Sequence, residues 1–279
     1  MRLILLGTGG GPRPRTDRLA ASQVLVINGA AYVIDCGDGV SNQLARAGVP
    51  LASLRGIFIT HHHSDHNADY GNLFMLAWVS GLNHNLETWG PPPLVSMTRQ
   101  FLEMNATDID IRIADEGRPP LAPLIHPHEL TGAGMVMQDE NVTVTCALVD
   151  HPPVYPAFAY RVSSADRSVV ISGDTRKSDQ LVALARGADV LVHEAFYEPA
   201  VARLNARVPN APRLKESIIS HHTSAQDAGR VAQAAGVGTL VLSHLVPPDD
   251  PDLTDQIWID AARSTFTGRI VVGKDLLEI

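Results

Sequence analysis

The chain has little cysteine, no long apolar run and no excess of basic residues. Only two cysteines, Cys36 and Cys146, occur among 279 residues, too few for a disulfide framework. Both lie in or beside apolar, strand-like runs, so we expect them to be small core residues. No apolar run approaches the roughly 20 residues that span a bilayer, and the N-terminus begins a strand rather than a secretory leader. We therefore expect a soluble, cytoplasmic protein that does not bind membranes.

Basic residues are outnumbered, with 22 Lys and Arg against 30 Asp and Glu. The net charge of -8 leaves no global basic field to attract nucleic acid. The glycine-rich stretch from Gly7 to Arg15 is not a Walker loop, because no Gly-Lys-Ser/Thr follows it. Its glycines allow close approach of the backbone to a ligand, although a simple tight connection would explain them too.

Histidine, by contrast, is concentrated in one place: residues 61–66 read His-His-His-Ser-Asp-His. They follow the apolar run from Gly56 to Ile59, which is typical of a buried strand. His61 and His63 are two positions apart, so both can point to the same side of an extended segment. The alternative, a solvated loop rich in histidine, does not explain why the cluster ends an apolar strand.

The residues after His63 favour the start of a helix. Ser64 and Asp65 are both good N-cap residues, and Asp65 and His66 can face a second ion from the helix turn. Imidazole and carboxylate together suit zinc, manganese or iron.

The pattern His61-x-His63-x-Asp65-His66 resembles the signature of the metallo-β-lactamase superfamily. The resemblance implies an α/β fold, a four-layer αββα sandwich with a one- or two-metal site at one edge, here as a single domain over residues 1–279. The sequences of residues 6–12 (LGTGGGP) and 35–39 (DCGDG) are similar to the ribonuclease Z branch. That branch also contains cyclic phosphodiesterases and a group of arylsulfatases. By this resemblance, Asp35 ties down the metal-site loops from behind.

The resemblance also supplies the remaining ligands, each after an expected strand. His151 follows a strand over 142–149, Asp174 follows one over 168–172, and His244 ends one over 239–243. The implied cofactors are two divalent metal ions, zinc by preference, with manganese or iron as alternatives. Asp174 would bridge the two ions. One ion would be bound by His61, His63 and His151. The other ion would be bound by Asp65, His66 and His244.

Three residues are the catalytic candidates: Asp65, Glu194 and His222. Glu194 lies in a His-Glu-Ala stretch and His222 in a His-Thr element, and both resemble elements of the ribonuclease Z branch. The resemblance implies that His222 contacts the scissile phosphate and that Glu194 orients it. A histidine that merely lies near a helix start is the alternative for His222, because Ser224 and Asp227 form a capping box directly after it.

Several functions share such a site. The first choice is a dinuclear metal-dependent phosphodiesterase acting on a small or nucleotide-like substrate through an activated water. The alternatives are a tRNA 3′-processing endoribonuclease and an arylsulfatase or lactonase; a non-catalytic metal-binding module would be expected to have lost ligands. Two features disfavour tRNA: residues 106–134 contain few basic side chains, and His244 is not followed by the Ser-x-Arg-Tyr-like sequence common in the branch. Dimers are common in that branch, so a homodimer is expected.

Other elements are predicted from local signals. Asn28-Gly29 predicts a hairpin between strands over 23–27 and 31–34. The Pro-rich residues 89–93 predict a rigid turn. Helices are expected up to residue 47, and over about 94–105, 178–186, 224–235 and 257–266, and a last strand over 269–272.

Overall fold

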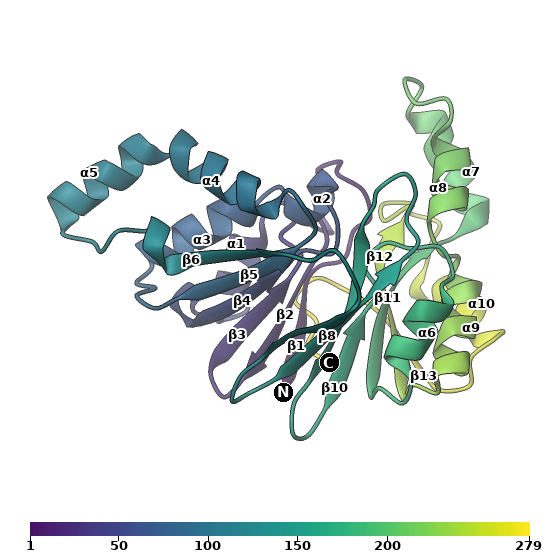
Figure 1. The fold of residues 1–279 in the computed structure, drawn as a ribbon. Coiled ribbons are helices and arrows are strands. Elements are labelled where there is room, and N and C mark those ends of the chain that lie inside the picture. Colours follow the sequence, from purple (N-terminus) through teal and green to yellow (C-terminus); the bar gives the residue numbers. More distant parts are fainter.

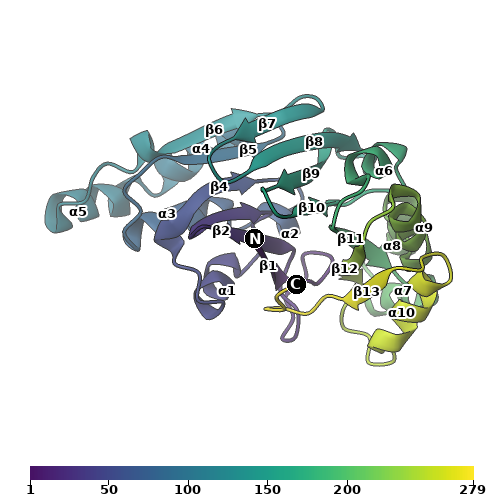
Figure 2. The ribbon, with the colours of Figure 1, turned by 90° about the horizontal axis from the view of Figure 1, so that it is seen from below.

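Two β-sheets pack face to face in this computed structural model, which describes residues 1–279 (Figures 1 and 2). The first sheet has six strands in chain order: β1 (Arg2–Gly7), β2 (Ser22–Ile27), β3 (Ala30–Ile34), β4 (Leu54–Phe58), β5 (Leu86–Gly90) and β6 (Ile125–Glu129). The second has seven, in the spatial order β13 (Arg269–Val272), β12 (Thr239–Val246), β11 (Val190–Phe196), β10 (Ser168–Ile171), β9 (Ala157–Ser163), β8 (Thr143–Val149) and β7 (Gly134–Gln138).

Helices cover the outer faces of both sheets, and the predicted αββα sandwich is confirmed. The first sheet packs against α1 (Val40–Arg46), α3 (Tyr70–Val79) and α4 (Leu94–Met104). The second packs against α6 (Asp179–Ala185), α9 (Ala225–Ala235) and α10 (Asp255–Arg263). Figure 1 shows α5 (Ala106–Glu116) projecting at one end, and α7 (Glu198–Arg207) and α8 (Leu214–His221) projecting at the other. No helix is both long enough and apolar enough to cross a membrane.

Large side chains fill the space between the sheets. Phe58 and Trp89 of the first sheet stack with their ring centroids 4.9 Å apart, and Tyr160 of the second meets Phe58 edge-on at 5.5 Å. Burying each such side chain contributes about 1.5–3 kcal/mol. Cys36 and Cys146 are buried and unpaired, as expected of core residues. The interior therefore holds both sheets in a fixed relation, and with them the loops at their edges.

Local signals predicted several elements correctly. Asn28 and Gly29 both have positive φ, 51° and 83°, as a two-residue hairpin between β2 and β3 requires. The Ser178 side chain accepts a hydrogen bond from the Leu181 amide at the start of α6, and Ser224 accepts one from Asp227 at the start of α9.

Other predictions were wrong, for reasons that lie in tertiary contacts. Trp89 and Gly90 belong to β5, not to a turn, because Trp89 stacks in the core and β5 pairs with β4. No element was predicted within residues 106–134, which contain α5 and β6. The helix after the histidines, α2 (Ser64–Asn67), starts at Ser64 without a side-chain cap. Finally, His244 does not end its strand; it is a bulged residue inside β12.

A candidate two-metal active site

The predicted ligands meet at one edge of the sandwich, on the segments that follow several neighbouring strands. The residues after β4 carry the contiguous motif, and those after β8 and β10 carry His151 and Asp174. His244 comes from β12 itself. Residues far apart in the chain thus converge because strand ends of two sheets meet at this edge.

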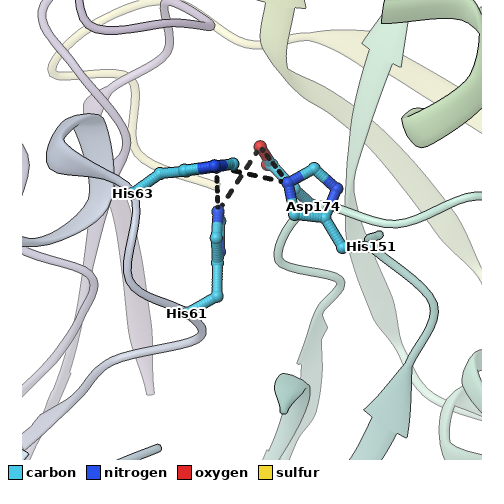
Figure 3. A group of neighbouring side chains, drawn as sticks. All are labelled: His61, His63, His151 and Asp174. Carbon is cyan, nitrogen blue, oxygen red and sulfur yellow. Dashed lines mark hydrogen bonds and ion pairs between the residues drawn. The ribbon is translucent and has the colours of Figure 1, made fainter. Parts of the chain in front are cut away.

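The first group consists of three imidazoles and a carboxylate (Figure 3). The Nδ1 atom of His63 lies 3.0 Å from His61 Nε2 and 3.3 Å from His151 Nε2. The Asp174 Oδ2 atom lies 3.9 Å from His61 Nε2 and 4.0 Å from His151 Nε2. One nitrogen of each ring therefore points to a common centre, the arrangement that a tetrahedral ion needs.

The second group lies on the other side of Asp174. His244 Nε2 is 3.2 Å from Asp65 Oδ2, and His66 Nε2 is 3.6 Å from the same oxygen. Both nitrogens are 3.3 Å from Asp174 Oδ2. Asp174 thus reaches both groups with a single oxygen, as a carboxylate between two ions would.

Partners behind the ligands fix the ring orientations. The Thr60 hydroxyl donates to Asp35 at 2.9 Å, so the Nδ1–H of His61 donates to the Thr60 oxygen at 3.0 Å. His66 donates from Nδ1 to Asp35 Oδ2 at 2.8 Å, and His151 donates from Nδ1 to a backbone carbonyl at 3.1 Å. In all three rings Nε2 is therefore the nitrogen that faces the site. Asp35 lies behind the ligands, where the resemblance put it.

Burial and charge set the protonation of the site. Burial lowers the pKa of His61 well below its usual value and that of His151 to about 4, so both rings are neutral. Burial also disfavours charge on His66, but the carboxylates of Asp174, Asp35 and Asp65 together raise its pKa well above normal. Burial opposes ionisation of Asp174 as well, yet the surrounding histidines keep its pKa well below the usual range.

The donor set fits divalent metal ions. His66 Nε2 and Asp174 Oδ1 are buried without any hydrogen-bond partner. Native protein interiors rarely leave buried polar atoms without a partner. Here the two atoms lie among imidazole nitrogens and carboxylate oxygens, which are common ligands of divalent metal ions. Nitrogen and carboxylate donors without thiolate suit zinc, manganese or iron.

His222 and Glu194 form a further pair next to Asp174, with His222 Nδ1 3.8 Å from Asp174 Oδ2. His222 Nδ1 donates to Glu194 Oε2 at 2.9 Å, and Glu194 Oε1 accepts from the Thr175 amide at 2.6 Å. Burial disfavours charge on the His222 ring, but Glu194, followed by Asp174 and Asp65, raises the pKa of His222 to about 9. The ring is therefore protonated at neutral pH, with its Nε2 side free for the adjoining pocket.

Two backbone features position His244. Glu194 pairs with Ser243 but Ala195 with Leu245, so His244 is the extra residue of a β-bulge and has φ of +45°. Its ring packs on Gly10, where a Cβ atom would lie 2.9 Å from His244 Nδ1. The glycine-rich stretch thus has a steric role that the sequence only suggested.

Neighbouring histidines lie outside the site. His62 bonds to the Pro91 carbonyl and to Asn67. His193 precedes Glu194 on β11 and faces the other way, since successive strand residues alternate.

An open pocket of about 420 Å³ adjoins both groups of candidate ligands. The glycine-rich stretch, with Arg13 and Arg15, lines one side. The other side consists of apolar residues of α7, the following loop and α8, which we call the α7–α8 wall: Leu204, Val208, Leu214 and Ile218. The glycine-rich stretch was expected to allow close approach of the backbone to a ligand, but neither its arginines nor the apolar wall was predicted. The wall gave no signal beyond ordinary helix patterning, and the arginines had only their place in a glycine-rich stretch.

Comparison with known proteins agrees with this architecture. The profile described as the β-lactamase superfamily domain matches residues 31–245. A ribonuclease Z of Mycobacterium bovis is 37% identical over 279 residues, covering 99% of this chain and 96% of the relative.

Solved structures share the fold over the whole chain. The metallo-β-lactamase fold protein YhfI of Bacillus subtilis superposes with a TM-score of 0.73 at 21% identity, over 100% of this chain and 98% of that one. The short form of human tRNase Z gives 0.71 at 22% identity, with the same coverage. The chain therefore belongs to the metallo-β-lactamase superfamily and is a metal-dependent hydrolase of its ribonuclease Z branch.

Proposed function

We propose that the chain is an endoribonuclease that cleaves a phosphodiester at the 3′ end of precursor tRNA. The whole-length match to ribonuclease Z carries this proposal, since it covers nearly all of both chains at 37% identity. This proposal places the tRNA endonuclease before the small-substrate phosphodiesterase, whereas the net charge of the chain had favoured the phosphodiesterase. A net charge of -8 describes the whole molecule, whereas RNA would meet only the face around the site.

The site residues have distinct roles under this proposal. The residues of the two groups would hold two ions, zinc by preference, with Asp174 between them: His61, His63 and His151; Asp65, His66 and His244. When bound, the ions would supply an activated water and stabilise charge on the attacking and leaving oxygens. The Gly11 amide donates to Asp65 Oδ2 at 2.9 Å and so fixes the carboxylate in the position from which it would hold an ion.

His222 would act on the substrate directly. Its protonated ring can donate a hydrogen bond to a phosphate oxygen or a proton to the leaving oxygen. Glu194 holds the ring by Nδ1 and is itself fixed by the Thr175 amide, so the donor is preorganised.

The second candidate is a phosphodiesterase for small or nucleotide-like substrates. The surface of α5 favours it, because Arg112 is already paired with Asp108 and Glu116, each at 3.0 Å. That projecting helix therefore offers no free cation to a tRNA.

The test compares a precursor tRNA with bis(p-nitrophenyl) phosphate, using protein loaded with zinc or manganese. We expect the trailer to be removed, and His222→Ala to lower kcat about 10²–10³-fold without loss of bound metal. His221→Ala is the matched control, because the His221 ring hydrogen-bonds only to Ser217 and the substitution keeps the backbone carbonyl that accepts from His151. Hydrolysis of the small ester with intact precursor would favour the second candidate instead.

A further inference from the structure

The pocket beside the metal groups has two chemically different sides. One is polar and cationic, formed by residues 10–15, and the other is the apolar α7–α8 wall together with Val246. Leu204 and Ile218 are each only 7% exposed, because they pack with Phe196 and Val246 in a small cluster of their own. The wall is thus held in place by its own small buried cluster.

Arg15 has an incompletely satisfied guanidinium. It donates to the carbonyl oxygens of Gly11 and Gly10 at 3.1 and 2.9 Å, both neutral partners. Its Nε atom is buried and has no partner. Burial lowers the pKa of Arg15 because it disfavours the charged guanidinium, and the nearby carboxylates of Asp249 and Asp65 offset this cost only in part. An anion in the pocket would relieve this cost.

The two glycines that anchor Arg15 also touch the proposed ligands. The Gly11 amide donates to Asp65 Oδ2 at 2.9 Å, and Gly10 packs on the His244 ring. An anion on Arg15 would therefore lie beside the reacting phosphate rather than in its place. Arg13 lies further out on the same stretch and pairs with Asp249 at 2.9 Å, an exposed pair that a phosphate could replace at little cost.

Resting on the proposed function, we infer that this pocket is a nucleotide subsite: Arg15 binds the phosphate next to the scissile one, and the α7–α8 wall takes the intervening nucleoside. A nucleic-acid strand presents a flat, apolar base face and a regularly spaced anion, and the two sides of the pocket match these two features. Sulfate esters and lactones have no second phosphate and would leave Arg15 unused. Arg13 adds charge at the rim.

The first test measures kcat and KM of the zinc-loaded enzyme and of Arg15→Ala on precursor tRNA and on bis(p-nitrophenyl) phosphate. We expect KM for the RNA to rise about tenfold with little change in kcat, since a uniform binding contact is lost. The small ester has one phosphate, so its kcat/KM should fall much less. Arg99→Ala removes an exposed charge on α4 paired only locally with Glu103 and is the matched control.

A binding measurement separates phosphate contact from a structural role. The affinity of metal-free protein for a fluorescent RNA with a 3′ trailer would be measured at several salt concentrations. Arg15→Ala should weaken binding about tenfold and reduce the slope of log Kd against log salt by about 0.7, whereas Arg15→Lys keeps most of the slope. If Arg15→Ala does not fold, Arg13→Ala at the exposed rim should give a smaller change in the same direction.

Unchanged KM and an unchanged salt slope in Arg15→Ala, with RNA cleaved normally by the wild type, would overturn the subsite and leave the proposed function standing. Failure of the wild type to cleave RNA would overturn both.

Discussion

The half of the molecule built on the first sheet supplies its candidate ligands from one continuous segment, residues 61–66, directly after β4. The half built on the second sheet supplies His151, Asp174 and His244 one at a time, separated by 22 and 69 intervening residues. The first set is nearly assembled by local geometry. The second exists only when the second sheet has assembled, because β9 and β11 lie between β8, β10 and β12, so the site depends on both sheets and on their packing.

Removing the residue that joins the two sets should have the largest effect. Asp174→Ala takes away the carboxylate that lies within 4.0 Å of groups from both halves. We expect about 10³-fold loss of kcat on bis(p-nitrophenyl) phosphate and loss of at least one bound ion per chain, measured by elemental analysis. Asp108→Ala on α5 is the control. Retention of both ions with full activity in Asp174→Ala would contradict a bridging role.

Weakening the hydrogen bonds that hold residues 61–66 in place should lower zinc affinity by less than the loss of Asp174. Asp35 accepts hydrogen bonds from the Thr60 amide, the Thr60 hydroxyl and His66. Asp35→Asn keeps the shape and tolerates the observed φ of +60°, but loses an acceptor oxygen. We expect zinc affinity, measured by competition with a chelator, to fall about 10–100-fold.

A carboxylate with the same local pattern provides the control for Asp35. Asp189 accepts from both the amide and the hydroxyl of Ser168, away from the site. Asp189→Asn should lower stability in a thermal melt without changing zinc affinity. An equal loss of affinity in both variants would mean that Asp35 acts only through folding.

A substitution at the contact between Gly10 and His244, which joins the two halves, should have the smallest effect. In Gly10→Ala the new Cβ would lie 2.4 Å from Val246 Cγ2 and 2.9 Å from His244 Nδ1, so the His244 ring must shift. We expect about a tenfold loss of zinc affinity at one of the two positions. Gly132→Ala, where a Cβ meets nothing within 4 Å, should bind zinc as the wild type does. The same zinc titration curve for both variants would show that His244 does not need a glycine at position 10 to pack in its observed place.

Features determined by neighbouring residues could be predicted from the sequence, and features that depend on pairing between distant strands could not. The motif over 61–66 and the Asn28–Gly29 hairpin were predictable because neighbouring residues determine them. The strand β5 was missed because its pairing with β4 is parallel and non-local. The bulge at His244 depends on the register between β11 and β12, which no local signal encodes. The roles of His151, Asp174 and His244 came from resemblance to a family, not from spacing.

Residues that form surfaces were the hardest to predict. Arg15 belongs to the opening loop, while the α7–α8 wall opposite comes about 190 residues later in the chain, a separation that follows from the positions of Arg15 and Leu204. The glycine-rich side lies partly in a motif, but neither Arg15 nor the wall was predictable from a motif, because a pocket is defined by the residues that face one another across it. Arg15 and the α7–α8 wall face each other only in the folded chain.

A zinc titration of metal-stripped wild-type protein tests most directly whether the two halves together build a two-metal hydrolytic site. Bound zinc and the rate of bis(p-nitrophenyl) phosphate hydrolysis would be followed in the same samples. We expect two ions per chain and a rate that is negligible without metal and reaches its maximum as the second ion binds. Full activity with a single ion per chain, or turnover in the stripped protein, would contradict it.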